Sequence, residues 1–447
     1  MLFTNKDLTR IIYPLIIEQI LVVTLGMADS MMVAYAGEAA VSGVSLVDTI
    51  NLLLSYIFSA LATGGAVVTS QFIGKRDYDS ARASAKQLLY SVLFISLIVM
   101  AFALVCRSSM LKLIFGSVED EVMFSAKSYL LYSALSYPFL ALYNGSAALF
   151  RSMGNSKISM IVSFIMNIVN IIGNAILIYE FNLGAAGAAI ATMICRIVGA
   201  VIMVALLYDR RNPIFIEKIL HFRPDFKIIK SILDIGIPNG IENGMFQFGK
   251  ILTQSLLATF GTVAIAANAV ASTISSFEYA IGTAIGLAMI TVIGRCIGAE
   301  DKNQARYYAK KLLIIEYIVM ISVIVTLTVL LKPIISIYNM NAEASSIAFQ
   351  LMIIHHILIT TIWPLSFTLP HSFRAANDVR YPLGISLVSM WIFRVVFSYI
   401  LAYAFDLGVF AVWFAMFMDW GFRAIFFGVR YLKGTWLTKY KPIETDN

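Results

Sequence analysis

Long apolar stretches recur along the whole chain and limit its fold more than any other feature of the sequence. Each has at least about 20 residues, which at a rise of about 1.5 Å per residue is enough to cross a hydrocarbon core of about 30 Å. The chain is therefore predicted to be an all-α polytopic membrane protein with twelve transmembrane helices. The approximate limits of the stretches are 11–36, 42–72, 88–110, 128–150, 158–180, 185–208, 235–258, 263–293, 312–331, 345–370, 382–404 and 408–429.

The composition supports this prediction. Hydrophobic residues make up 60% of the chain and charged residues only 13%, whereas charged residues form about a quarter of a soluble domain. The first stretch is longer than the apolar core of a signal peptide and has no small-residue cleavage site after it, so we expect a retained helix. Cys106, Cys195 and Cys296 lie in or beside apolar stretches, which favours packing over a disulfide framework.

The positive charges lie mostly on one side of the predicted membrane. If the N-terminus is cytoplasmic, 25 of the 33 lysines and arginines fall in inward loops and tails, and four fall in outward loops. The positive-inside rule then places both termini in the cytoplasm and the protein in the cell (inner) membrane. The net charge of +7 therefore reflects topology, and we expect no nucleic-acid partner.

An internal repeat divides the chain. Residues 73–86 return at 297–310, displaced by 224 positions, and the same offset pairs Pro14 with Pro238 and Glu18 with Glu242. Six helices per repeat is an even number, so the two halves cross in the same sense and a pseudo-twofold axis along the membrane normal relates them. We expect an N-terminal six-helix lobe at 1–208, a cytoplasmic linker at 209–234 and a C-terminal six-helix lobe at 235–447.

Four polar residues are predicted to form a cation site in the outer half of the N-terminal lobe. Counted from the ends of their stretches, Asp29, Asn174 and Thr192 lie roughly 10 to 12 Å below the outer surface, and Asn170 lies one helical turn below Asn174. A carboxylate with amide and hydroxyl oxygens suits a monovalent cation or a coupling proton. The second half of the chain lacks these four polar residues. The equivalent positions, 224 residues later, hold Thr253, Arg394, Ser398 and Met416.

An alternative remains open for these residues, in which the asparagines only join helices and Asp29 pairs with a basic group. Other acidic residues inside the stretches are candidate substrate contacts, because ionisable groups in a membrane are usually functional. These are Glu18, Glu242, Glu278 and Asp48, with Lys250 as a possible ion-pair partner of Glu242. The predicted spans contain seven acidic and four basic residues, a balance that favours cationic over anionic substrates.

Other chemistry is not indicated. His355 and His356 are adjacent, so their side chains point about 100° apart, and no carboxylate or cysteine stands near them at ligand spacing. We expect them to pack or to line a pore. No metal is predicted beyond a possible Na⁺ at the Asp29 cluster, and no cofactor. The chain lacks a nucleophile with a plausible base and a sizeable soluble loop, so it is not expected to be an enzyme.

Four motifs resemble those of the multidrug and toxic compound extrusion (MATE) family over essentially the whole chain. The resemblance implies a cation site at Asp29, Asn170, Asn174 and Thr192, although some archaeal members have Asp at the place of Asn174. Members of the sodium-coupled type carry two C-lobe acids where this chain has Phe246 and, approximately, Trp363. The motifs are Pro14 with Gly26-x-x-Asp29, Gln71-x-x-Gly74 with Ala81, Arg151-x-x-Gly154-x-x-Lys157, and Asn170-x-x-x-Asn174 followed by Gly184-x-x-Gly187-Ala188-Ala189-x-Ala191-Thr192.

These features predict an antiporter coupled to Na⁺ or H⁺ that exports amphipathic, cationic small molecules by alternating access, as a monomer in the lipid bilayer. The major facilitator superfamily also has two six-helix halves, but its charged loop after span 2 has a Gly-Arg that is missing here. A flippase of lipid-linked saccharides, from the same superfamily as MATE exporters, remains the alternative. Its cavity would be basic, so exposure of Arg196, Arg394 and Arg423 separates the two functions.

Overall fold

The computed structural model describes residues 2–116, 118–217, 223–440 and 442, and this part of the chain contains helices and no strands. Ten of its helices are long and apolar enough to cross a membrane. Two further helices, α5 and α8, have 33 residues each and carry more polar side chains. The prediction of an all-α membrane protein with twelve transmembrane spans in two lobes is confirmed.

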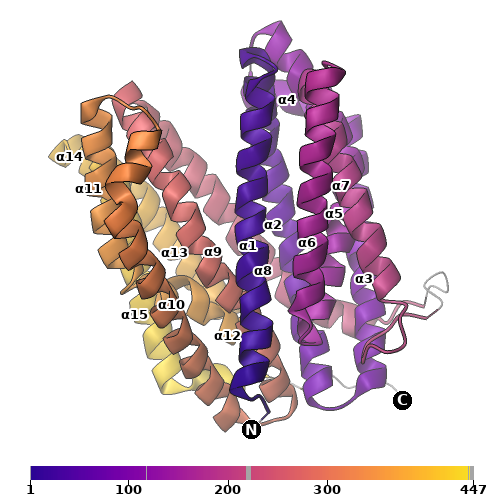
Figure 1. Ribbon diagram of the computed structural model, residues 1–447. Coiled ribbons are helices and arrows are strands. Elements are labelled where there is room, and N and C mark those ends of the chain that lie inside the picture. Colours follow the sequence, from indigo (N-terminus) through magenta and orange to yellow (C-terminus); the bar gives the residue numbers. More distant parts are fainter. Residues whose placement is uncertain (1, 117, 218–222, 441, 443–447) are drawn as a thin grey trace. The chain divides into compact units, whose positions relative to one another are not determined.

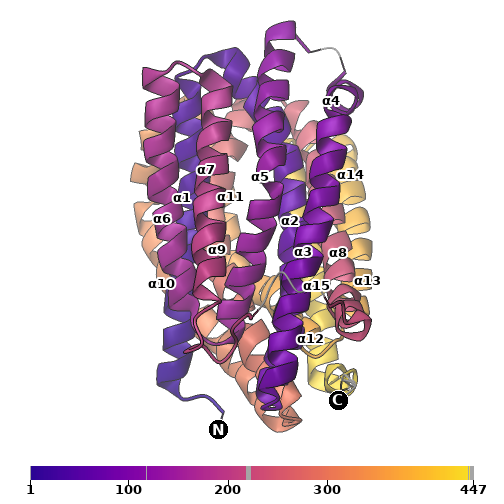
Figure 2. The same cartoon turned by 90° about the vertical axis from the view of Figure 1, so that its right-hand side faces the viewer.

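The first six spans form one bundle, in which α5 packs against α2, α3 and α7 and α1 packs against α6 (Figures 1 and 2). The helix of span 5, α6, continues as a π-helical segment, η1, that begins directly after Asn174. The elements are α1 (Asn5–Ala34), α2 (Glu38–Gly74), α3 (Tyr78–Val105), α4 (Arg107–Phe115), α5 (Asp120–Ser152), α6 (Ser156–Asn174), η1 (Ala175–Glu180) and α7 (Gly184–Leu206).

The last six spans are more interrupted. Spans 10 and 11 both contain π-helical segments, η2 and η3, between their α-helical parts. The elements are α8 (Phe226–Ala258), α9 (Thr262–Gly298), α10 (Lys302–Ile337), α11 (Ala342–Ile359), η2 (Pro364–Thr368), α12 (Leu369–Ala375), α13 (Arg380–Val388), η3 (Ser389–Val396), α14 (Phe397–Phe405), α15 (Val409–Lys433) and η4 (Thr435–Thr438).

The chain forms two compact units, which contain Phe3–Gly240 and Ile241–Pro442 respectively. The division falls inside α8. This helix begins at Phe226, so the last part of the predicted linker is already helical. Residues 218–222 of the linker, with the Lys218 that was counted among the inward charges, lie outside the described residues, as does Lys441 near the C-terminus.

The repeated segment forms the same turn twice. Asp77 caps α3 by accepting a hydrogen bond from the Ser80 amide, and Asp301 caps α10 by accepting one from the Gln304 amide. Each aspartate follows a residue in the left-handed region, Arg76 or Glu300. A side-chain acceptor at the N-cap satisfies a free helix amide, so the repeated Asp is explained by a helix start.

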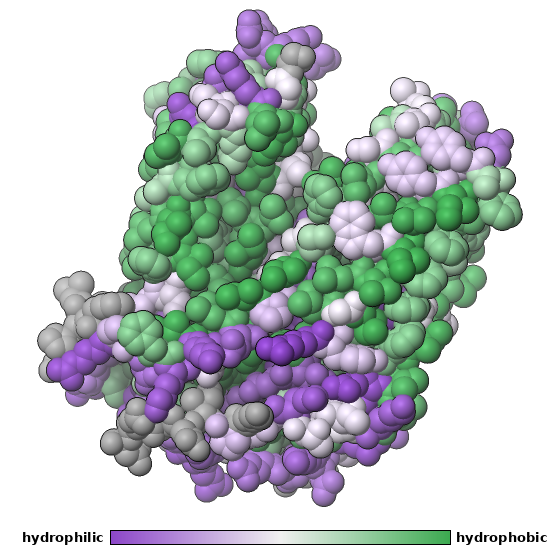
Figure 3. Space-filling model, turned by 180° about the vertical axis from the view of Figure 1, so that it is seen from behind, coloured by the Kyte–Doolittle hydropathy of each residue, from purple (hydrophilic) through white to green (hydrophobic). Residues whose placement is uncertain are grey.

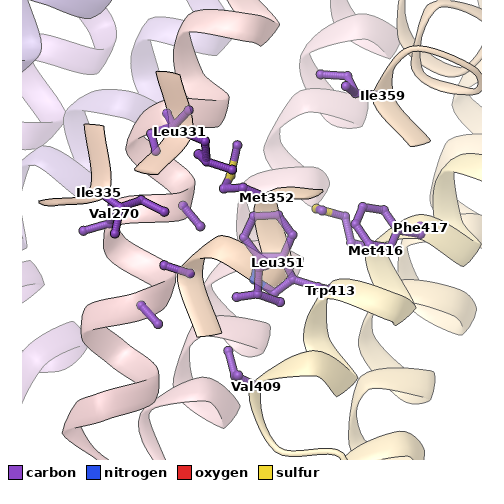
Figure 4. Packing of buried hydrophobic residues seen from close by; sticks show 14 of the residues in the cluster. Val270, Leu331, Ile335, Leu351, Met352, Ile359, Val409, Trp413, Met416 and Phe417 are labelled. Carbon is purple, nitrogen blue, oxygen red and sulfur yellow. The ribbon is translucent and has the colours of Figure 1, made fainter. Parts of the chain in front are cut away.

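Apolar side chains fill the interior and also cover the outer surface. On the face seen in Figure 3, hydrophobic residues cover most of the middle, and hydrophilic residues gather at the lower end of the view and at its top. This is the distribution expected for helices in lipid. Inside the C-terminal unit, α9, α10, α11 and α15 share a buried cluster that includes Val270, Leu331, Met352 and Trp413 (Figure 4).

Helices α2 and α8 cross closely through glycines within the N-terminal unit. A Cβ atom on Gly64 would lie 2.3 Å from the carbonyl oxygen of Ile232 and 3.0 Å from the amide nitrogen of Gly236. A Cβ on Gly236 would in turn lie 3.2 Å from Leu61 Cα. Small residues at a helix crossing let backbones approach in a membrane, so no larger side chain fits at Gly64.

We expect Gly64→Ala to destabilise the protein by about 1 to 3 kcal/mol, because the methyl group meets backbone atoms that cannot rotate away. The apparent melting temperature of the purified protein in detergent should fall by about 5 °C. Gly26→Ala is the matched control, since a Cβ there meets nothing within 4 Å. An unchanged melting temperature for Gly64→Ala would contradict the close crossing.

Candidate functional site

The four residues of the predicted cation site form one chain of hydrogen bonds in the N-terminal unit. The Asn174 amide nitrogen lies 2.6 Å from Asp29 Oδ1 and 3.1 Å from Asn170 Oδ1. Asn170 in turn donates to Thr192 Oγ1 at 3.2 Å. The helices α1, α6 and α7 each supply a part, so the structure brings together the residues that the depth calculation placed at one level.

One oxygen of this cluster has no partner within the described part of the chain. Asn174 is fully buried, its amide nitrogen serves both Asp29 and Asn170, and its Oδ1 atom accepts no hydrogen bond there. A buried acceptor left alone is unfavourable by about 1 to 3 kcal/mol. Together with the Asp29 carboxylate, this oxygen provides ligands suited to a hard monovalent cation.

Asp48 lies close to the cluster, on α2. It accepts hydrogen bonds from Tyr129 Oη at 3.0 Å and from Asn51 Nδ2 at 3.3 Å. Arg196 on α7 interacts electrostatically with both Asp29 and Asp48, while its guanidinium donates to Ser136 Oγ at 2.7 Å. This region of the N-terminal unit therefore holds two carboxylates and one guanidinium.

Glu18 and Glu242, the symmetric pair of predicted substrate contacts, lie in two equivalent buried ion pairs. Glu18 contacts Arg151 at 3.1 Å and accepts a hydrogen bond from Ser159 at 2.6 Å. Glu242 contacts Arg374 at 2.7 Å and accepts one from Ser386 at 2.7 Å. Each glutamate thus has a guanidinium and a hydroxyl as partners within its own unit.

These pairs change two expectations from the sequence. The partner of Glu242 is Arg374 rather than Lys250. Arg151 and Arg374 were counted as cytoplasmic, but both reach buried glutamates, so the excess of acids over bases inside the spans shrinks from three to one. The charge balance alone therefore no longer favours a cationic substrate.

Glu278 and Asp419 of the C-terminal unit are also buried. Glu278 on α9 contacts both His355 and His356 of α11, whose partnership with a carboxylate was not predicted. Asp419 on α15 lies 2.7 Å from Arg423 and 3.6 Å from Arg394. No group of three His, Cys, Asp or Glu side chains is arranged to hold a metal ion within the residues that the structure describes.

Comparison with known proteins assigns both halves to one family model. The MatE model matches residues 14–176 and again residues 238–400. Each limit of the second match lies 224 residues after the corresponding limit of the first, which is the offset of the internal repeat. The matched segments together cover more than half of the chain.

Individual relatives align over nearly their whole length. The uncharacterized transporter YisQ of Bacillus subtilis is 27% identical over 97% of this chain and 95% of its own. The probable multidrug resistance protein NorM of Thermotoga maritima is 26% identical over 97% and 93%. A transporter of the MOP superfamily from Pyrococcus furiosus, described as having a binding pocket of reverse polarity, superposes with a TM-score of 0.89 at 18% identity over 97% and 96% of the two chains, which shows a shared fold.

We expect Arg374→Met to destabilise the protein by about 3 to 5 kcal/mol, because it leaves the Glu242 carboxylate buried without a counterion. Thermal unfolding of the purified variant measures the effect. The double variant Glu242→Gln/Arg374→Met removes both charges and should recover most of the stability. If the single and double variants melt alike, the two residues do not form the pair described above.

Proposed function

The chain belongs to the multidrug and toxic compound extrusion family, and from this we propose that it is an antiporter that exchanges a cation for an amphipathic small molecule. The binding of Na⁺ or H⁺ at Asp29 drives alternating access of the two six-helix halves, and the substrate is carried out of the cell. The observation that carries the proposal is the Asp29 cluster. Its carboxylate is hydrogen-bonded to a neutral amide, and an unpartnered amide oxygen lies beside it.

The charges around Asp29 support the uptake of a single cation. Asp29, Asp48 and Arg196 interact with one another and together carry one excess negative charge when both acids are ionised. An unbalanced charge away from water is unfavourable by at least about 3 kcal/mol in a membrane helix. Binding one Na⁺ or one H⁺ removes it. Arg196 interacts with Asp29 electrostatically, and no guanidinium forms an ion pair with Asp29 among the described residues, so the cation can leave again when the site opens to the outside.

The substrate class follows from the relatives and from this region. NorM of Thermotoga maritima carries the name of a probable multidrug resistance protein, and we infer a similar range of amphipathic drugs here. A cationic substrate is favoured by Asp48, whose partners Tyr129 and Asn51 are neutral. Glu18, Glu242 and Glu278 are left out of the proposed substrate contacts, because basic or imidazole side chains already occupy their carboxylates.

The flippase alternative receives less support. It requires exposed basic residues in the C-terminal unit, but Arg394 and Arg423 are 9% and 2% exposed and face Asp419. Arg196 is only partly buried but lies beside two carboxylates. In both units, nearby acidic side chains thus offset the positive charge of these arginines. Such a site is poorly suited to bind an anionic lipid-linked sugar.

The orientation remains part of the proposal. We place both termini in the cytoplasm and the protein in the cell (inner) membrane, because the basic loops lie on the side of the termini. We propose that one chain is the transporting unit, since the repeat supplies both six-helix halves within it. No cofactor is required beyond the coupling ion.

We expect Asp29→Asn to abolish gradient-driven efflux. The amide keeps the shape of the side chain but cannot exchange a cation, and insertion into the membrane should be unchanged because a neutral group enters lipid more easily. Efflux of a fluorescent organic cation from proteoliposomes, with proton and sodium gradients imposed separately, measures the effect. The gradient that drives the wild-type protein identifies the coupling ion.

Asp79→Asn is the matched control, because Asp79 is 94% exposed and lies at the start of α3. It should transport at the wild-type rate. Equilibrium binding of the organic cation should survive in Asp29→Asn better than transport does. Normal efflux by Asp29→Asn would eliminate the proposed site, and loss of both binding and folding would assign Asp29 a structural role.

A further inference from the structure

Helix α8 carries a polar face in the part that belongs to the C-terminal unit. Asn243 and Gln247 are half-buried there, and Lys250 and Gln254 are exposed. At about 100° per residue, these four side chains lie within about 60° of one another around the helix axis. They form a polar stripe along one side of a membrane-spanning helix, called here the polar face of α8. The proposed transport mechanism does not use it.

A different face of α8 is exposed and apolar. Ile241 is 48% exposed and Phe248 is 51% exposed, and both lie about 160 to 180° away from Lys250 around the helix axis. Apolar side chains are stable against lipid, whereas an exposed amide or ammonium is unfavourable there. The polar face is therefore suited to a water-filled cavity, and the face of Ile241 and Phe248 is suited to lipid.

Lys250 lies too deep in its span to reach the membrane surface. Eight residues separate it from the end of α8 at Ala258, which is about 12 Å at a rise of about 1.5 Å per residue. Lysines near helix ends extend their ammonium group to the interface, but this distance exceeds the length of a lysine side chain. The positive charge of Lys250 therefore stays within the span.

No acidic side chain is paired with Lys250 in the part of the chain that the structure describes. Glu242 and Asp419, two buried acids of the same unit, are each already bound to an arginine. Arg394 does act on Lys250 electrostatically, but it carries the same positive charge. An unbalanced charge within a span is unfavourable by about 3 kcal/mol or more, so an anion that binds at Lys250 is stabilised.

The neighbouring segment η3 places this second cation beside α8. The two elements touch at Gly249, where a Cβ atom would lie 2.2 Å from Met390 Cε. Arg394, one helical turn after Met390, lies over the Phe246 ring of α8 at 5.0 Å from its centroid. The Nε atom of Arg394 has no hydrogen-bond partner among the described residues. A buried donor is thus left open next to the ammonium of Lys250.

We propose that the polar face of α8 is a binding site for the carboxylate group of an amphipathic organic substrate. The Lys250 ammonium supplies the opposite charge, and the side-chain amides of Gln247 and Gln254 donate hydrogen bonds to the carboxylate oxygens. The inference deepens the proposed function, because it adds an anionic group to the compound whose cationic group Asp48 attracts. It rests on that function only for the claim that the bound compound is transported.

A carboxylate fits this site better than the headgroup of a lipid. Phospholipid headgroups remain at the membrane surface, whereas Lys250 lies about 12 Å below the end of its helix. A pyrophosphate-linked sugar carries more than one negative charge and would need a second cation without an acidic partner, but Arg394 and Arg423 both contact Asp419. One unpaired ammonium matches one carboxylate.

Equilibrium binding of two dyes to the purified protein in detergent tests the proposal without a transport assay. Rhodamine B has a free carboxyl group, which is ionised at about pH 7.5, and its ethyl ester has the same aromatic cation without that negative charge. Fluorescence anisotropy measures both affinities. We expect Lys250→Met to lower the affinity for the acid about tenfold relative to the ester. Lys250→Gln, which also removes the charge, should lower this ratio similarly, and Lys250→Arg should keep it.

Two controls separate this site from other effects. Lys302→Met makes the same change at an exposed position at the start of α10 and should leave the ratio of affinities unchanged. Asp29→Asn should also leave it unchanged although it abolishes transport, so either proposal can fail without the other. An equal loss of affinity for both dyes in Lys250→Met, or an unchanged ratio, would overturn the carboxylate site. Displacement of rhodamine B from the wild-type protein by phosphatidylglycerol would assign Lys250 to a lipid headgroup instead.

Discussion

The exclusion of unbalanced charge from an apolar interior governs the arrangement of this protein. Three buried acid–arginine pairs are each neutral, with contacts of 3.1 Å or less between the two charged groups. They are Glu18 with Arg151, Glu242 with Arg374, and Asp419 with Arg423. Removing one member of such a pair would leave a buried charge, which is unfavourable by several kcal/mol. Each pair lies within a single unit, so each six-helix half is electrostatically complete by itself in these regions.

The groups that lack a fixed cation are the ones suited to exchange. A carboxylate bound to a guanidinium holds its counterion permanently, because the arginine cannot be deprotonated in a protein. Asp29 is hydrogen-bonded to an asparagine instead, and Glu316 to the Thr368 hydroxyl. Neutral partners orient a carboxylate without neutralising its charge, so the carboxylate keeps the capacity to bind a cation or a proton. The distribution of arginines therefore separates structural acids from candidate functional ones.

The twelve spans could be predicted from the sequence because they depend on the length of each apolar stretch. The Asp29 cluster could be predicted because it depends on the depth of each residue within its stretch. Helical rise places Asp29, Asn174 and Thr192 at one level, and the structure connects them through Asn170. Contacts between distant spans were missed. Arg151 was assigned to a loop, but α5 continues to Ser152 and the long side chain reaches Glu18. The sequence did contain an indication of this contact, because both of its members recur in the repeat, as Glu242 and Arg374. No such signal links Glu278 to His355, 77 positions away.

The two halves share one repeat but carry different clusters of buried polar residues. The C-terminal half lacks the Asp29 cluster, with Thr253 and Met416 at two of the equivalent positions. Displacement of Glu278 and His355 by the same offset leads to Leu54 and Leu131, so the N-terminal half lacks the second cluster, which Glu278 forms with His355 and His356. The first cluster uses the first, fifth and sixth spans of its half, and the second uses the second and fourth of its own. The buried Glu–Arg ion pair was retained in both halves, whereas the other buried polar clusters differ, so the two halves have the same charge-neutral framework around different polar groups.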